Sequence, residues 1–131
     1  MPQTLTDYIV AFNALDANAI VGSYRYPLCV ITNSDTLLYK TKADFKPAIE
    51  RLLKVYRLHK FKYAKITRET ITSEIGAIRS IDVQWALFNK NDEIILEFDL
   101  TYLQKMDIKD RPFIGVVAHN EMEKWQEKMA R

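Results

Sequence analysis

Residues 8–24 read YIVAFNALDANAIVGSY, and this stretch determines how the fold begins. Apolar side chains recur every three or four residues from Leu5 to Leu15, which is the spacing of one face of an α-helix. The spacing predicts a helix over residues 4–16. The segment ANAIV (17–21) predicts a short second helix, which Gly22 is expected to end because glycine accepts the left-handed conformation found at helix C-termini.

Farther along the chain the pattern changes from helical to extended. Apolar positions between Phe45 and Tyr56 predict a long helix that ends near His59, with Asp44 as its N-cap and Pro47 in its first turn. From residue 62 onward, apolar and polar residues alternate and β-branched residues are frequent, which predicts strands. The four predicted strands are YAKITRETITSEI (63–75), IRSIDVQWALF (78–88), EIILEFDLTYL (93–103) and FIGVVAH (113–119).

Two shorter strands are predicted before the long helix, LCVIT (28–32) and TLLYK (36–40), joined by a turn at NSD. Asn120 and Glu123 predict the start of a short helix after the last strand. Helices followed by a strand-rich meander indicate an α+β fold, in which the N-terminal helices pack on a curved antiparallel sheet. The alternation in residues 81–87 places Trp85 on the covered face and Asp82 and Gln84 on the other.

Size and composition limit the class of protein. A chain of 131 residues with 48% hydrophobic and 27% charged residues is typical of one soluble globular domain, which we expect to span residues 1–131. The apolar runs are far shorter than the roughly 20 residues that a bilayer requires, so no membrane association is expected. The N-terminus lacks the pattern of a secretory signal, and a single cysteine forms no internal disulfide, which favours a cytoplasmic location.

The segment YIVAFNALDANAIVGSY resembles the opening of the nuclear transport factor 2-like superfamily, which includes ketosteroid isomerases, polyketide cyclases and scytalone dehydratase. The resemblance rests on an amphipathic helix with Asn13 and Asp16 near its end, a short second helix that ends before an aromatic residue, and then a strand. It implies a cystatin-like cone with an apolar pocket between helices and sheet. It also implies a homodimer, formed through the polar residues of the uncovered sheet face: Asp82, Gln84, Glu97 and Thr101.

The resemblance gives the motif YRYP (24–27) a place at the rim of the pocket, where the chain leaves the second helix and enters the first strand. Proline alone accounts for this bend, because it keeps Tyr26 out of the helical region. We expect a small apolar or aromatic molecule to bind in the pocket. The expected ligand-binding residues are Tyr8, Phe12, Tyr26, Tyr56, Trp85 and Tyr102.

Whether the pocket is also catalytic is left open by the sequence. Tyr8 matches the tyrosine with which the family's ketosteroid isomerases bind the developing oxyanion, but the segment RYPLCVITN lacks the carboxylate base that these enzymes place there. One alternative is an isomerase, cyclase or dehydratase that pairs Tyr8 with His119 or Asp99. Another is a scaffold in which the pocket is simply core. The sequence has no metal-ligand spacing and no phosphate-binding loop, so no metal or other cofactor is expected.

Residues 40–68 carry ten lysines and arginines but only two acidic residues, Asp44 and Glu50. Aromatic residues between these cations are compatible with a nucleic-acid surface that stacks on bases. The pattern favours instead an amphipathic helix with Lys46, Lys54 and Arg57 toward solvent, so we expect no nucleic-acid partner.

Overall fold

The described part of the chain begins with two helices, two strands and a third helix, and a series of longer strands follows. The computed structural model describes residues 3–107 and 113–129. In these ranges the elements are α1 (Gln3–Asn13), α2 (Ala17–Gly22), β1 (Tyr24–Ile31), β2 (Thr36–Tyr39), α3 (Lys42–Leu58), β3 (Phe61–Ile75), β4 (Ile78–Asn89), β5 (Ile94–Lys105), β6 (Phe113–Ala118) and α4 (Glu121–Met129).

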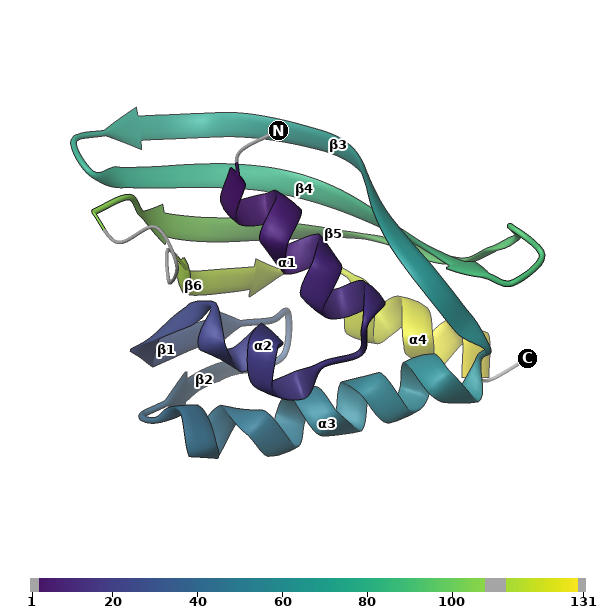
Figure 1. Ribbon diagram of the computed structural model, residues 1–131. Helices are drawn as coiled ribbons and strands as arrows, with labels where there is room; N and C mark the ends of the chain where they lie inside the picture. Colours follow the sequence, from purple (N-terminus) through teal and green to yellow (C-terminus); the bar gives the residue numbers. More distant parts are fainter. Residues whose placement is uncertain (1–2, 108–112, 130–131) are drawn as a thin grey trace.

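The strands form one sheet of six in the order β2-β1-β6-β5-β4-β3. The expected α+β arrangement is confirmed: a curved, unclosed sheet carries α1, α2 and α3 on one face, and its long strands β3 and β4 bend across the molecule (Figure 1). Register shifts near Arg68 and Ser73 in β3 mark bulges, which increase local bending.

The expectation of an entirely antiparallel sheet is wrong at one pair of strands. β1 runs parallel to β6, with Cys29 opposite Gly115, whereas the other neighbouring strands pair antiparallel. The antiparallel neighbours are consecutive in the chain. β1 and β6 are separated by most of the sequence, so no turn fixes their relative direction and the local pattern carries no signal for it.

The core lies between the helices and the concave face of the sheet. Alternate residues of β4 and β5 point into it: Ile81, Val83, Trp85 and Leu87 are at most 2% exposed, as expected from the alternation. Tyr102 and Phe113 are also fully buried.

Two polar side chains position the first helices. The Oδ1 atom of Asn13 accepts a hydrogen bond of 2.7 Å from the backbone amide of Ala64, which joins the end of α1 to β3. Asp16 caps α2 by accepting from the amide of Ala19 at 3.1 Å. Between them Leu15 has a φ of 51°, so α1 ends earlier than the spacing of apolar residues predicts.

The expected end of α2 at Gly22 is confirmed, but the left-handed conformation expected there is wrong. Gly22 is not among the residues with positive φ, and the chain leaves the helix through Ser23, which has ordinary right-handed angles. The backbone amide of Ser23 donates to the carbonyls of Ile20 and Val21, so the last turn is closed without a left-handed residue.

The N-cap expected for α3 is also wrong. The helix begins three residues earlier than Phe45, and Thr41 is its cap, with Oγ1 accepting from the amide of Asp44 at 3.2 Å. Asp44 therefore lies inside the first turn, where its charge suits the positive end of the helix dipole. Pro47 lies within the helix rather than in its first turn.

The YRYP motif is part of β1 rather than a bend before it. The Tyr26–Pro27 peptide bond is cis, and the pairing of β1 with β6 is interrupted between Tyr24 and Cys29. Among the helices of the described ranges, none combines the length and the apolar character needed to cross a bilayer.

An aromatic cavity with an enclosed glutamate as candidate functional site

A cavity of about 390 Å³ lies between the concave face of the sheet and the helices α1, α3 and α4. This volume is in the range of small-molecule sites. Leu37 and Arg51 are exposed lining residues and mark its opening between β2 and α3. The lining is mainly apolar, and its aromatic members are Tyr8, Phe12, Tyr24, Tyr39, Phe45, Tyr56, Trp85, Phe98, Tyr102 and Trp125.

Three buried hydroxyl groups lie along one side of this cavity. Tyr8 and Tyr24 are hydrogen-bonded through their hydroxyls, and the indole Nε1 of Trp85 donates to the hydroxyl of Tyr102 at 3.1 Å. Burial raises the pKa of all three tyrosines well above its ordinary value. The hydroxyls are therefore neutral and serve as hydrogen-bonding groups rather than as bases.

Glu121 is the one acidic residue in the cavity lining. Its Oε2 atom accepts hydrogen bonds from the Tyr56 hydroxyl at 2.9 Å and from the Trp125 indole at 3.1 Å. The residue keeps some exposure, but protein atoms enclose its carboxyl group. This burial raises the pKa of Glu121 to about 7, although the bonds from Trp125 and Tyr56 act in the opposite direction.

The local sequence explains why Glu121 is held at the cavity. It is the first residue of α4, one helical turn before Trp125, so the two side chains lie on the same face of the helix. Trp125 is 3% exposed and packs between Tyr56 and His59, with ring centroids 5.6 and 4.9 Å away. The buried indole thus directs this face of α4 inward.

Sequence reasoning missed Glu121 because it treated the start of this helix as a cap. The Asn120 side chain instead bonds Asp99: its Oδ1 accepts from the Asp99 amide at 2.8 Å, and its Nδ2 donates to the Asp99 carboxylate at 3.1 Å. The available signal was the spacing of Glu121 and Trp125, which puts an acid beside a large apolar ring on one helix face.

Five of the six expected ligand-binding residues line the cavity, namely Tyr8, Phe12, Tyr56, Trp85 and Tyr102. Tyr26 is not among the lining residues. Its ring packs on Phe45, its hydroxyl donates to the carbonyl of Val21 at 2.8 Å, and burial raises its pKa to about 12. That these residues contact a ligand stays a prediction.

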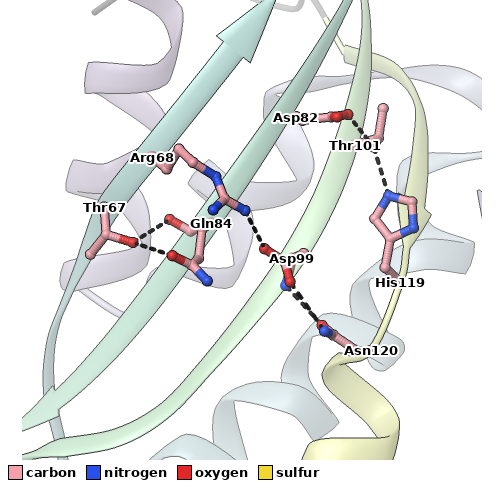
Figure 2. Close-up of polar contacts among 8 residues, drawn as sticks. All are labelled: Thr67, Arg68, Asp82, Gln84, Asp99, Thr101, His119 and Asn120. Carbon is pink, nitrogen blue, oxygen red and sulfur yellow. Dashed lines mark hydrogen bonds and ion pairs between the residues drawn. The ribbon is translucent and has the colours of Figure 1, made fainter. Parts of the chain in front are cut away.

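The structure does not bring His119 and Asp99 to Tyr8. Both are on the polar side of the sheet, away from the cavity (Figure 2). Thr101 bonds both Nε2 of His119, at 2.7 Å, and the carboxylate of Asp82, at 2.6 Å, while Asp99 pairs with Arg68 at 3.4 Å. Pairing Tyr8 with either residue is therefore incompatible with this geometry.

A second hollow, of about 430 Å³, lies between α2 and α3. It is lined by charges of both signs, from Asp16, Lys46, Glu50, Lys54 and Arg57. Glu121, whose carboxyl group is enclosed, is not among its lining residues. The neighbouring aromatic residues of α3 face inward. The outer face of α3 is thus the solvated side of an amphipathic helix.

Solved structures with a similar fold come from several bacteria. An NTF-2 like protein of unknown function from Shewanella oneidensis superposes with a TM-score of 0.65 at 18% identity, covering 89% of this chain and 93% of that one. A protein from Catenulispora acidiphila with a ketosteroid isomerase-like fold, in complex with trimethylamine, gives 0.63 at 9% identity, covering 99% and 94%.

A ketosteroid isomerase-like protein from Erwinia carotovora atroseptica gives a TM-score of 0.58 at 11% identity, covering 88% of this chain and 89% of that one. At these identities the likeness concerns the fold. None of the curated protein sequences matches the chain. A family model described as NTF2-like protein (DUF6841) matches residues 1–121, and the chain therefore belongs to this NTF2-like family.

Proposed function

We propose that this protein binds a small apolar or aromatic molecule in the cavity between its helices and its sheet. The observation that carries the proposal is a cavity of about 390 Å³ with a largely aromatic lining and one carboxyl group. Apolar walls with few polar groups are typical of small-molecule sites, where the polar groups fix the ligand's orientation. The trimethylamine bound by the Catenulispora protein supports a small-molecule role for this fold.

Both tryptophans of the chain line the cavity, so intrinsic fluorescence reports directly on its occupancy. We expect tert-butylbenzene, a neutral aromatic probe, to change the fluorescence of Trp85 and Trp125 in a saturable manner. Ala48 lines the cavity from α3, and Ala48→Phe should occupy part of it and weaken binding. Ala43→Phe makes the same change at an exposed position of the same helix and should leave binding intact. Binding that both variants retain equally would contradict the proposal.

A second function, a proton-transferring isomerase, cyclase or dehydratase, is favoured by Glu121. A carboxyl group with a pKa of about 7 beside a ligand-sized cavity is suited to general acid–base catalysis near neutral pH. In an isomerase, Glu121 would take a proton from the carbon next to a ketone and return it to another carbon. The Tyr8 hydroxyl lines the same cavity and would donate to the enolate oxygen.

Turnover of an enolisable ketone separates these two functions. We expect the wild type to bind such a ketone with little turnover, and Tyr8→Phe to weaken binding by about 0.5–1.5 kcal/mol, the net worth of one neutral hydrogen bond. Rapid turnover by the wild type, with at least about a hundredfold loss in both Tyr8→Phe and Glu121→Gln, would establish the enzyme instead.

The proposal includes a homodimer in the cytoplasm. Curved sheets of this superfamily often pair through the face away from the helices, where Asp82, Gln84, Glu97 and Thr101 lie in this chain. The single cysteine, Cys29, is free, which suits a reducing compartment.

A further inference from the structure

The charges at the cavity wall favour a ligand of one sign. Glu121 and Arg51 are the lining residues whose side chains can carry a charge near neutral pH. Arg51 is exposed at the opening, where solvent screens its charge, whereas the Glu121 carboxyl group is enclosed. No ion pair among the described residues involves Glu121, and the groups that bond it are neutral. The interior therefore holds one negative charge without a positive partner when Glu121 is ionised.

Only one of the two carboxyl oxygens of Glu121 accepts hydrogen bonds from the described part of the chain. Tyr56 and Trp125 both donate to Oε2, and the residues in these ranges donate no hydrogen bond to Oε1. The two donors hold the carboxyl group in place and favour its ionised form. The second oxygen is left for a ligand in the cavity.

Aromatic rings continue from this carboxyl group into the cavity. Trp125, Tyr56, Phe12 and Trp85 form a row, here called the aromatic wall, in which successive ring centroids are 5.6, 6.2 and 5.6 Å apart. The faces of such rings attract cations, tryptophan most strongly, and aromatic cages of this composition recognise quaternary ammonium groups. The aromatic wall and Glu121 thus favour the same type of ligand group.

We propose that the cavity binds an organic ammonium ion with an apolar or aromatic arm, its cationic head beside Glu121 and the aromatic wall. This inference rests on the proposed function and names the ligand class for the same site. The head replaces the missing positive partner of the carboxylate, and the arm occupies the apolar remainder of the cavity. Methyl groups on the nitrogen reduce the cost of removing the cation from water, which suits a lining with few polar groups.

Binding of such a ligand should depend on pH. A permanently charged ammonium ion pairs with ionised Glu121 only, and acid protonates the carboxyl group, so affinity should fall as pH decreases. With a pKa of about 7, the ionised fraction predicts affinity about thirtyfold weaker at about pH 5.5 than at about pH 8.

The other titratable groups near Glu121 come from four elements. Tyr56 and Arg51 belong to α3, and His59 is its C-cap. Tyr24 belongs to β1 and Tyr102 to β5, and on α4 itself Glu123 and Lys124 are neighbours in sequence. The buried tyrosines stay neutral over this pH range. His59 packs on the ring of Trp125 but is not itself a lining residue, and it is the group to control for.

Phenyltrimethylammonium and tert-butylbenzene form the matched pair of probes, because they have the same shape and differ in one positive charge. Isothermal titration calorimetry of the wild type with both probes, at about pH 5.5 and about pH 8, measures the preference directly. At the higher pH we expect the cation to bind at least about tenfold more tightly than its neutral isostere. At the lower pH the affinity for the cation should be about thirtyfold weaker, while the affinity for its neutral isostere should be unchanged.

Two variants test whether the pH dependence of cation binding comes from Glu121. Glu121→Gln preserves the shape of the side chain and should abolish both the preference for the cation and its pH dependence, while tert-butylbenzene still binds. His59→Gln should retain the full pH dependence. If Glu121→Gln does not fold, the wild-type measurements at the two pH values decide the matter alone.

The outcomes separate this inference from the function on which it rests. If tert-butylbenzene binds but the cation binds no more tightly, or equally at both pH values, the ammonium proposal is overturned and the binding function stands. A neutral ligand that binds better below pH 7 would also overturn it, since Glu121 would then act as a protonated donor. If neither probe binds, both proposals fail.

Discussion

At the scale of single residues, Trp85 joins the core to the cavity. It is 2% exposed, its ring centroid lies 5.6 Å from that of Phe12 and 6.3 Å from that of Tyr8, and its indole bonds Tyr102. The alternation along β4 had already placed it on the covered face. One side chain therefore contributes to both stability and the wall of the site.

Trp85→Ala should lower the free energy of unfolding by roughly 3–5 kcal/mol, because it removes a large buried ring and leaves a void. Urea denaturation of the two proteins measures this difference. Lys90→Ala, at an exposed position in the turn after β4, is the control and should change stability by about 0.5 kcal/mol or less. An unchanged midpoint for Trp85→Ala would disprove the face assignment.

Glu121 should make stability depend on pH. Its pKa is raised from the ordinary 4.5 to about 7 in the folded chain, so between these values the folded chain keeps a proton that the unfolded chain has released. The free energy of unfolding therefore falls as pH rises through this window, by up to roughly 3 kcal/mol.

Glu121→Gln removes this contribution, and the comparison cancels the contributions that the two proteins share. We expect the stability of the wild type relative to Glu121→Gln to fall between about pH 4.5 and about pH 7. A difference between the two proteins that stays constant over this range would show that the carboxyl group is not enclosed.

At the scale of elements, α3 shows how a local pattern identifies a helix without fixing its start. The apolar stripe is correct, since Phe45, Ile49 and Tyr56 are buried. Thr41 and Asp44 both have short side chains of the type preferred at an N-cap. The structure selects Thr41, so the helix starts at Lys42, three residues before Phe45.

Thr41→Ala should destabilise the protein by roughly 1 kcal/mol, the usual cost of losing an N-cap side chain, and Thr41→Ser should restore most of it. Asp44→Ala should cost less, because Asp44 contributes only through the helix dipole. Thermal unfolding of the three variants ranks them. A larger loss of stability for Asp44→Ala than for Thr41→Ala would show that Asp44 is the N-cap.

The elements also show what the sequence can and cannot predict. The strands β3 to β6 are where the alternation of side chains predicts them, because alternation is a local property. The parallel pairing of Cys29 with Gly115 and the burial of Glu121 depend on segments far apart in the chain. Local patterns therefore predicted the fold class and five of the residues that line the cavity, but they missed its carboxyl group.

At the scale of the whole molecule, the two faces of the sheet differ in character. The concave face is apolar and holds the cavity. The opposite face carries a network of side-chain contacts in which Thr67 bonds Gln84 at 3.1 Å and Arg68 reaches Asp99 (Figure 2). A dimer formed through this outer face would leave the cavity and its opening free.

Light scattering should therefore report twice the 15.3 kDa mass of one chain at micromolar concentration. Gln84→Arg should shift the protein to monomers, because it adds two like charges across the pairing faces. Binding of tert-butylbenzene should persist in this variant, since Gln84 lies on the face away from the cavity. A monomeric wild type would contradict the dimer but not the binding site.

The enclosed carboxyl group of Glu121 is central to two proposals, the proton-transferring enzyme and the binding of an ammonium ion. The most direct measurement is an NMR titration of its ¹³C-labelled side-chain carboxyl group in the folded protein, with the resonance assigned by its loss in Glu121→Gln. We expect a midpoint of about 7, which reflects burial opposed in part by the bonds from Trp125 and Tyr56. A midpoint near the ordinary value of 4.5 would show a solvated carboxylate and contradict the site described for this cavity.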